Sequence, residues 1–148
     1  MLKVIFVCHG NYHRYPMAQG LFQKLIEEKE LKTKVFCDSA GTVCTHPDIE
    51  PHINTLELLE KEGITLVHKA RLFNYKDLAS FDYIIAMDHF NIRDIFYLKK
   101  QSKQNKENIY LLRQFDPELE NYNTISLYDA IKNSAFDVPD PELFNLAG

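Results

Sequence analysis

The sequence has little of what marks fibrous, disordered or secreted disulfide-rich proteins. Its 148 residues include no tryptophan and only 5 glycines, 6 prolines and 3 cysteines. This composition excludes a collagen-like or low-complexity chain. The three cysteines are an odd number without zinc-type spacing, which disfavours both a disulfide framework and a metal site. We therefore expect a cytoplasmic protein without a bound metal or other cofactor.

Long apolar runs and an excess of basic residues are also missing. The apolar run at 4–8 is too short for a signal-peptide core or a membrane span. The chain has 17 Lys and Arg against 21 Asp and Glu, a formal charge of -4. No overall positive field exists to hold nucleic acid or anionic lipid. We expect neither a nucleic-acid nor a membrane partner, and any anion site must be built locally.

The residues that are present suit a single folded α/β domain over residues 1–148. Hydrophobic residues make up 45% of the chain and charged residues 26%, which is enough for one proper core. Apolar runs predict strands at 3–8, 34–38, 81–87 and 109–112. Helices are expected from Pro16 onward and at 50–62 (ended by Gly63), 89–99 and 124–133, before an irregular tail at 137–148. The alternation indicates a parallel sheet covered by helices.

The first strand-to-helix connection carries the main chemical signal. Cys8 ends an apolar strand, five residues follow, and Arg14 comes just before a helix start. Backbone N–H groups of such a loop can converge on an anion, and the arginine fork can bind two phosphate oxygens. The same field favours a thiolate at Cys8, placed to attack phosphorus. The residues expected to contact phosphate are His9, Gly10, Asn11, Tyr12, His13 and Arg14.

A core cysteine and a chance Cys/Arg spacing form the alternative interpretation. The position favours function, because parallel sheets bind ligands at the carboxyl ends of their strands. The sequence also resembles the low-molecular-weight protein tyrosine phosphatase family, whose loop reads Cys-x-Gly-Asn-x-Cys-Arg-Ser-Pro. The loop matches are Cys8, Gly10, Asn11, Arg14 and Pro16, and further matches lie at 38–42, 68–71, 81–84, 87–88, 91–94 and 137–141.

The resemblance implies a four-stranded parallel sheet in the order 2-1-3-4 with helices on both faces. It also implies a phosphomonoester hydrolase that acts on a phosphotyrosine protein or small aryl phosphate and releases inorganic phosphate. In that case Cys8 is the nucleophile, Arg14 the phosphate clamp and Asp140 the general acid and base. The residues implied to support the loop are Asn11, Tyr15, Ser39 and His68. Asp116, which also precedes proline, is the alternative acid.

Several residues depart from the family pattern. Tyr15 stands where the family has a serine whose hydroxyl helps to lower the pKa of the nucleophile. We therefore expect the pKa of Cys8 to be higher than that of the nucleophile in other family members. His13 replaces a second loop cysteine. Glu142 and Leu143 replace two tyrosines that wall the family's substrate pocket. These changes leave phosphotyrosine preference less firmly indicated than phosphate chemistry.

Two further function classes remain open. An arsenate reductase shares this fold and loop, but it relays oxidation through further cysteines, and no cysteine follows Cys44. A non-catalytic phosphate or phosphopeptide-binding module would explain the altered Tyr15 position. A binder has no need of a nucleophile and a proton donor together, so an enzyme is favoured.

Overall fold

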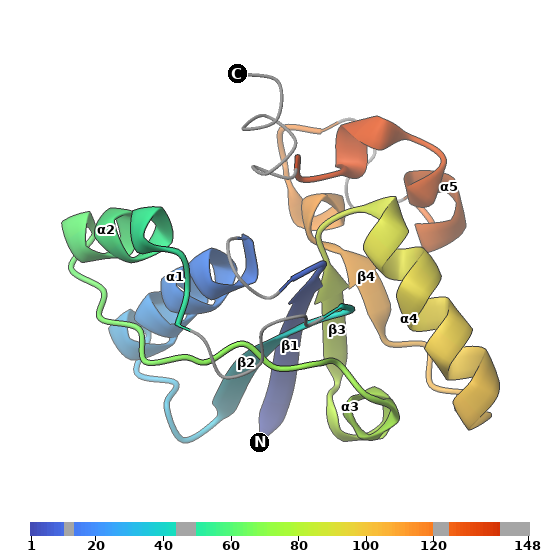
Figure 1. Ribbon diagram of the computed structural model, residues 1–148, viewed down its shortest axis with the longest axis horizontal. Coiled ribbons are helices and arrows are strands. Elements are labelled where there is room, and N and C mark those ends of the chain that lie inside the picture. Colours follow the sequence, from blue (N-terminus) through green and yellow to red (C-terminus); the bar gives the residue numbers. More distant parts are fainter. Residues whose placement is uncertain (11–13, 44–49, 120–124, 140–148) are drawn as a thin grey trace.

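A computed structural model describes residues 1–10, 14–43, 50–119 and 125–139. Its centre is a four-stranded parallel sheet with the strand order β2-β1-β3-β4, which confirms the expected topology (Figure 1). The strands are β1 (Leu2–Cys8), β2 (Val35–Gly41), β3 (Tyr83–Ala86) and β4 (Ile109–Leu111). The helices are α1 (Arg14–Glu28), α2 (Ile53–Lys61), α3 (Tyr75–Ser80), α4 (His89–Ser102) and α5 (Leu127–Ile131), with short 3-10 turns η1 (Leu112–Phe115) and η2 (Ser134–Phe136).

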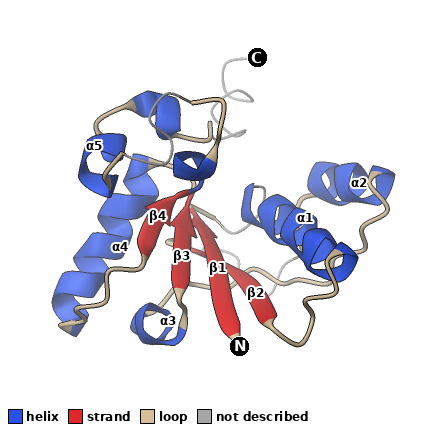
Figure 2. Ribbon diagram, turned by 180° about the vertical axis from the view of Figure 1, so that it is seen from behind, coloured by secondary structure: helices blue, strands red, loops and turns tan. Residues whose placement is uncertain are grey.

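Helices cover both faces of the sheet, as expected (Figure 2). Alternate β1 side chains point to opposite faces. Ile5 and Val7, both fully buried, join the core formed with α3, α4 and α5. Val4, Phe6 and Cys8 face α1 and form a second core. Each fully buried aliphatic side chain contributes about 1.5–3 kcal/mol, so β1 is anchored from both sides.

The parallel register brings the strand ends that carry the site to one edge. Cys8 pairs with Gly41 of β2, and Val7 pairs with Ala86 of β3. Helices α1 and α4 both begin just beyond this edge, after β1 and β3. The N–H groups of their first turns therefore point toward the region where the chain leaves the sheet.

The first two helices differ from expectation in their bounds. Helix α1 begins at Arg14, so Pro16 is its third residue; the first-turn N–H groups have no intrahelical partner, and proline is tolerated there. Helix α2 begins only at Ile53, capped by His52. It ends as predicted near Gly63, whose φ of 73° allows the Gly63 and Ile64 N–H groups to bond back to Glu60 and Leu59.

Helix α3 is absent from the sequence prediction. It has only six residues, and a capping box between Asn74 and Asp77 starts it.

The second strand runs on to Gly41 because its last residues pair with Phe6, Val7 and Cys8. The third and fourth strands are shorter than predicted, since Phe81 caps α3 and Leu112 starts η1. Helix α5 covers Leu127–Ile131 within the predicted 124–133, after Ser126 caps it.

Candidate active site

The candidate loop leaves the sheet at Cys8, whose position is fixed from both neighbouring strands. Cys8 is 3% exposed. Its carbonyl accepts a hydrogen bond from the Thr42 N–H at 2.8 Å, and the His9 carbonyl accepts one from the Val43 N–H at 2.9 Å. On the other side, the Met87 N–H donates to the Val7 carbonyl at 3.2 Å. The chain around the Cys8 thiol is therefore held at the carboxyl edge of the sheet.

Arg14 closes the loop as the first residue of α1, with its side chain 5% exposed. Its Nη1 donates to Asp88 Oδ2 at 2.8 Å and to the Val138 carbonyl at 2.7 Å. Asp88 follows β3 and caps α4, where its Oδ1 accepts from the Asn91 N–H at 2.9 Å. Two segments distant in the sequence thus hold one guanidinium nitrogen of Arg14.

The segment 137–139 lies along the same edge. The Val138 N–H donates to the Met87 carbonyl at 2.7 Å. The Asp137 carboxylate accepts hydrogen bonds from the His89 backbone N–H at 2.9 Å and from the His89 Nδ1 at 2.6 Å. The chain immediately before Asp140 is therefore tied to the β3–α4 corner beside Arg14.

The described residues include only part of the predicted site. His9 is exposed, Gly10 is half-buried and Tyr15 is fully buried against the α1-side core. The remaining predicted site residues and pocket departures lie outside the described residues: Asn11, Tyr12, His13, Asp140, Glu142 and Leu143. The expected pKa of Cys8 stays a prediction.

Ser39 and His68, predicted to support the loop, lie next to each other behind it. The Ser39 hydroxyl donates to Gln19 Oε1 at 2.6 Å and lies 3.2 Å from His68 Nε2. Because a hydroxyl has one proton to donate, His68 Nε2 carries hydrogen and donates to Ser39. Burial lowers the pKa of His68, the Asp38 charge opposes this shift, and the Arg71 charge adds to it. His68 is therefore a neutral donor at pH 7.

An ion-paired arginine joins β2 to α3 beneath this network. Arg71 Nη2 lies 2.9 Å from Asp38 Oδ2, and its Nη1 lies 3.0 Å from Asp77 Oδ2. Burial alone would lower the pKa of Arg71, but the hydrogen bonds and charges of Asp77 and Asp38 raise it above its ordinary value. The residues around His68 are thereby fixed to the sheet.

Asp116, the alternative acid, follows η1. Its Oδ1 accepts from the Glu118 N–H at 3.0 Å, and its Oδ2 lies 3.7 Å from Arg113 Nη2. Among the described residues, the side-chain hydrogen bonds of Arg14 go to Asp88 and Val138 and not to Asp116. The structure gives Asp116 a local turn-capping contact.

Three observations bear on functions other than phosphate chemistry. Cys37 is 5% exposed, and burial, with the nearby Asp38 charge, raises its pKa to about 12. It belongs to the core that faces α1. In the described ranges, no three His, Cys, Asp or Glu side chains gather in a way that could hold a metal ion. No helix in those same ranges is both long and apolar enough to cross a membrane.

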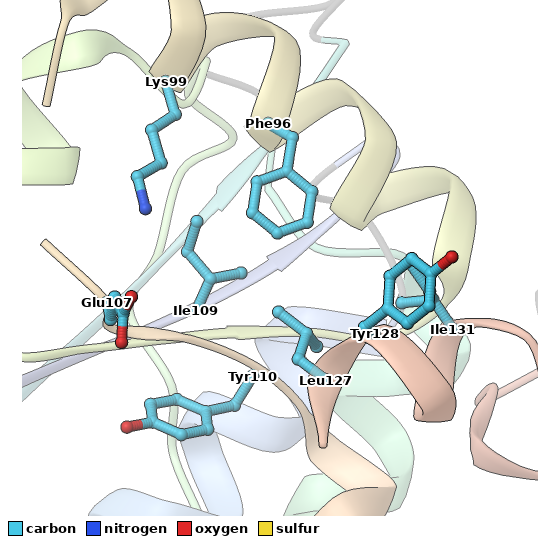
Figure 3. Close-up of a pocket in the computed structure, with 8 residues that line it drawn as sticks. All are labelled: Phe96, Lys99, Glu107, Ile109, Tyr110, Leu127, Tyr128 and Ile131. Carbon is cyan, nitrogen blue, oxygen red and sulfur yellow. The ribbon is translucent and has the colours of Figure 1, made fainter. Parts of the chain in front are cut away.

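Two cavities of similar size differ in their relation to the site. One of about 410 Å³ lies among α4, β4 and α5 (Figure 3), and its lining contains none of the predicted site residues. Its walls are mainly apolar and aromatic: Phe96, Lys99, Glu107, Ile109, Tyr110, Leu127, Tyr128 and Ile131. The other, also about 410 Å³, is lined by Arg14, Val138 and Pro139, by residues of α1 and α2, and by Met87 and Leu112. The second cavity adjoins the candidate site.

Sequence reasoning gave no role to Asp88 or Gln19, which hold Arg14 and Ser39. Asp88 had a usable signal, because an acidic residue directly after a buried strand and before a helix is both a cap and a group at the ligand edge of the sheet. Gln19 had none, since a polar residue in an amphipathic helix is usually solvated.

Comparisons with known proteins place this geometry in one family. A sequence model described as "Low molecular weight phosphotyrosine protein phosphatase" matches residues 3–146. The enzyme of that name from Gallus gallus is 37% identical over 116 residues, covering 78% of this chain and 73% of the relative. The crystal structure of YfkJ from Bacillus subtilis superposes with a TM-score of 0.82 and 35% identity, over 98% of this chain and 82% of that chain. A YwlE arginine phosphatase mutant with a phosphorylated active-site serine has a TM-score of 0.70 and 26% identity, over 80% of this chain and 74% of that chain.

Proposed function

The chain belongs to the low molecular weight phosphotyrosine protein phosphatase family, and from this premise we propose that Cys8, Arg14 and Asp140 carry out its phosphatase reaction. The substrate class that we propose is a phosphotyrosine protein or a small aryl phosphate, and the product is inorganic phosphate. A nucleophilic thiol stays reduced most readily in the cytoplasm, where we propose that the protein works.

The first step forms a cysteinyl-phosphate. The Cys8 thiolate attacks phosphorus, so that a sulfur–phosphorus bond forms while the bond from phosphorus to the phenolic oxygen breaks. Arg14 and the N–H groups at the start of α1 bind the non-bridging oxygens, where negative charge accumulates. Asp140 gives its proton to the departing phenolate, which is a poor leaving group at neutral pH.

The second step returns the enzyme to its starting state. A water molecule gives a proton to the Asp140 carboxylate while the water oxygen forms a bond to phosphorus. The sulfur–phosphorus bond breaks, and the Cys8 thiolate and inorganic phosphate are released. No electrons are gained or lost in either step, so the cycle balances without a redox cofactor.

The geometry of Arg14 is the observation that carries this proposal. Its guanidinium lies at the carboxyl edge of the sheet, 2.8 Å from Asp88 and 2.7 Å from the Val138 carbonyl. Asp140 follows Val138 by two residues, a stretch of chain that spans at most about 7 Å. This connection favours Asp140 over Asp116, whose carboxylate caps its own turn.

The test compares wild type with three variants on phenyl phosphate, a phosphotyrosine peptide and phosphoarginine. We expect hydrolysis of the two aryl substrates and its abolition in Cys8→Ser. Asp140→Asn should lower kcat by a factor on the order of 10² to 10⁴, whereas the matched Asp116→Asn should retain activity. Hydrolysis that survives Cys8→Ser would overturn the mechanism, and a preference for phosphoarginine would overturn the substrate class.

The two alternatives make different demands on the chain. A reductase needs a second accessible thiol, whereas Cys37 is buried with a pKa of about 12, and Cys44 lies outside the described residues. A binding module would hold a phosphotyrosine peptide without releasing phosphate. Arsenate-dependent oxidation of an added thiol would favour the reductase. Binding of a phosphotyrosine peptide without turnover would favour the binding module.

A further inference from the structure

His89 and Asp137 form a contact that none of the proposed chemical steps uses. Both oxygens of the Asp137 carboxylate are engaged by one residue, Oδ1 by the His89 backbone N–H at 2.9 Å and Oδ2 by His89 Nδ1 at 2.6 Å. An ionised carboxylate only accepts, so Nδ1 carries the hydrogen. His89 is the first residue of α4, where the helix dipole and an N–H group without an intrahelical acceptor favour a carboxylate.

The contact lies in a segment with further attachments to the same corner. The Val138 N–H bonds to Met87 at 2.7 Å, and the Val138 carbonyl accepts from Arg14 at 2.7 Å. The Asp137 carbonyl lies 3.4 Å from Arg113 Nη1. The Asp137 side chain is 16% exposed, so the carboxylate and its two hydrogen bonds are largely shielded from competing water.

We infer that His89 and Asp137 are a positioning pair that fixes the segment 137–139 so that Asp140 is held in reach of the leaving oxygen. The inference rests on the proposed function. Asp140 is three residues beyond Asp137, a chain length of at most about 10 Å. Proton transfer requires the donor within hydrogen-bond reach of the oxygen, so freedom in this short segment directly reduces the fraction of productive complexes.

Neither residue of the pair is itself a catalytic group. A purely structural role would lower the activity toward every substrate by the same factor. A positioning role makes a different prediction, since a substrate with a good leaving group needs little help from a general acid. The loss must then grow with the pKa of the leaving group.

The experiment measures kcat/KM of His89→Ala and Asp137→Ala on phenyl phosphate and 2,4-dinitrophenyl phosphate. This constant reports the steps up to cleavage of the phosphorus–oxygen bond. Phenol has a pKa of about 10, like the tyrosine side chain, while the dinitrophenolate leaves readily as an anion. We expect about a tenfold loss on phenyl phosphate and less than about a twofold loss on the dinitrophenyl ester. The control Asp129→Asn, which alters an exposed carboxylate on α5 bonded to Ser126, should change neither.

Two additional measurements separate the possible causes of a loss. In an Asp140→Ala background, His89→Ala should have no further effect on phenyl phosphate, because the acid that it positions is gone. Each variant should also retain its thermal shift with added inorganic phosphate, which shows that it folds and that the Arg14 site is intact. Equal losses on both esters, or the same tenfold loss without Asp140, would overturn the inference.

Failure of the inference differs from failure of the proposed function. If wild type hydrolyses phenyl phosphate and Cys8→Ser does not, uniform effects of the His89 and Asp137 variants refute only the positioning role. If Cys8→Ser remains active, the cysteinyl-phosphate mechanism itself is wrong.

Discussion

Replacing Asp88 with alanine removes the carboxylate that balances the charge of Arg14. The Asp88 side chain is 12% exposed and the Arg14 side chain 5%, so the pair is largely shielded from water. Asp88 also caps α4 through a reciprocal capping box with Asn91. The change therefore has two energetic consequences, which a matched variant can separate.

Loss of a helix cap costs about 1 kcal/mol. Leaving a buried charge without its partner costs about 3–5 kcal/mol, and the lower end applies because Arg14 keeps its bond to the Val138 carbonyl. We expect a total loss of about 4 kcal/mol in the free energy of unfolding. For a chain of this size, that corresponds to a decrease in Tm of roughly 10 °C.

Urea unfolding of Asp88→Ala and Asn74→Ala provides the assay. Asn74 takes part in a similar reciprocal capping box on α3, so its removal should cost only about 1 kcal/mol. Added inorganic phosphate should recover more stability in Asp88→Ala than in wild type, since the anion replaces the lost negative charge beside Arg14. Two results would contradict the Asp88–Arg14 pairing: an equal loss of stability in Asp88→Ala and Asn74→Ala, or an equal stabilisation of Asp88→Ala and wild type by phosphate.

Three further predictions concern residues around the site. Tyr15→Ser should lower the free energy of unfolding by about 3–5 kcal/mol because it empties a fully buried position, whereas Tyr15→Phe should retain most of that stability; equal urea midpoints for the two variants would contradict this. Burial lowers the pKa of His68 from 6.5, so the unfolded chain binds the proton more readily, and stability should be full above that value and fall as the pH decreases below it. His68→Gln should flatten this part of the stability profile, and an unchanged profile would remove His68 as its cause. With a pKa of about 12 and burial, Cys37 should resist iodoacetamide at neutral pH in a Cys8→Ser, Cys44→Ser variant until urea unfolds it; modification in the native state would show that the thiol is accessible.

The strands and the two ends of the candidate loop, at Cys8 and Arg14, could be predicted because their signals are local. A β-branched run ending in Cys8, a proline in the first turn of α1 and a glycine just after α2 each mark a structure by their own chemistry. The family resemblance supplied the strand order, which the structure confirms, and the proposed role of Asp140; periodicity gives neither.

The missed features depend on contacts between distant residues. Helix α3 has six residues, too few for a periodic signal. The end of β2 is a strand because residues 39–41 pair with β1, although their own strand propensity is low. The Arg14–Asp88 contact joins residues 74 apart, and the His89–Asp137 contact joins residues 48 apart. Such pairs form only once the sheet order brings their elements together.

Trapping the phosphorylated enzyme tests the central claim most directly. Asp140→Asn is mixed with 2,4-dinitrophenyl phosphate, which can form the intermediate without the acid, and the reaction is quenched and digested for mass spectrometry. We predict one phosphoryl group on the peptide that contains Cys8, and none in the same experiment with a Cys8→Ala variant. Phosphate release by Asp140→Asn with no phosphoryl group on that peptide, or with one on another residue, would contradict a cysteinyl-phosphate at Cys8.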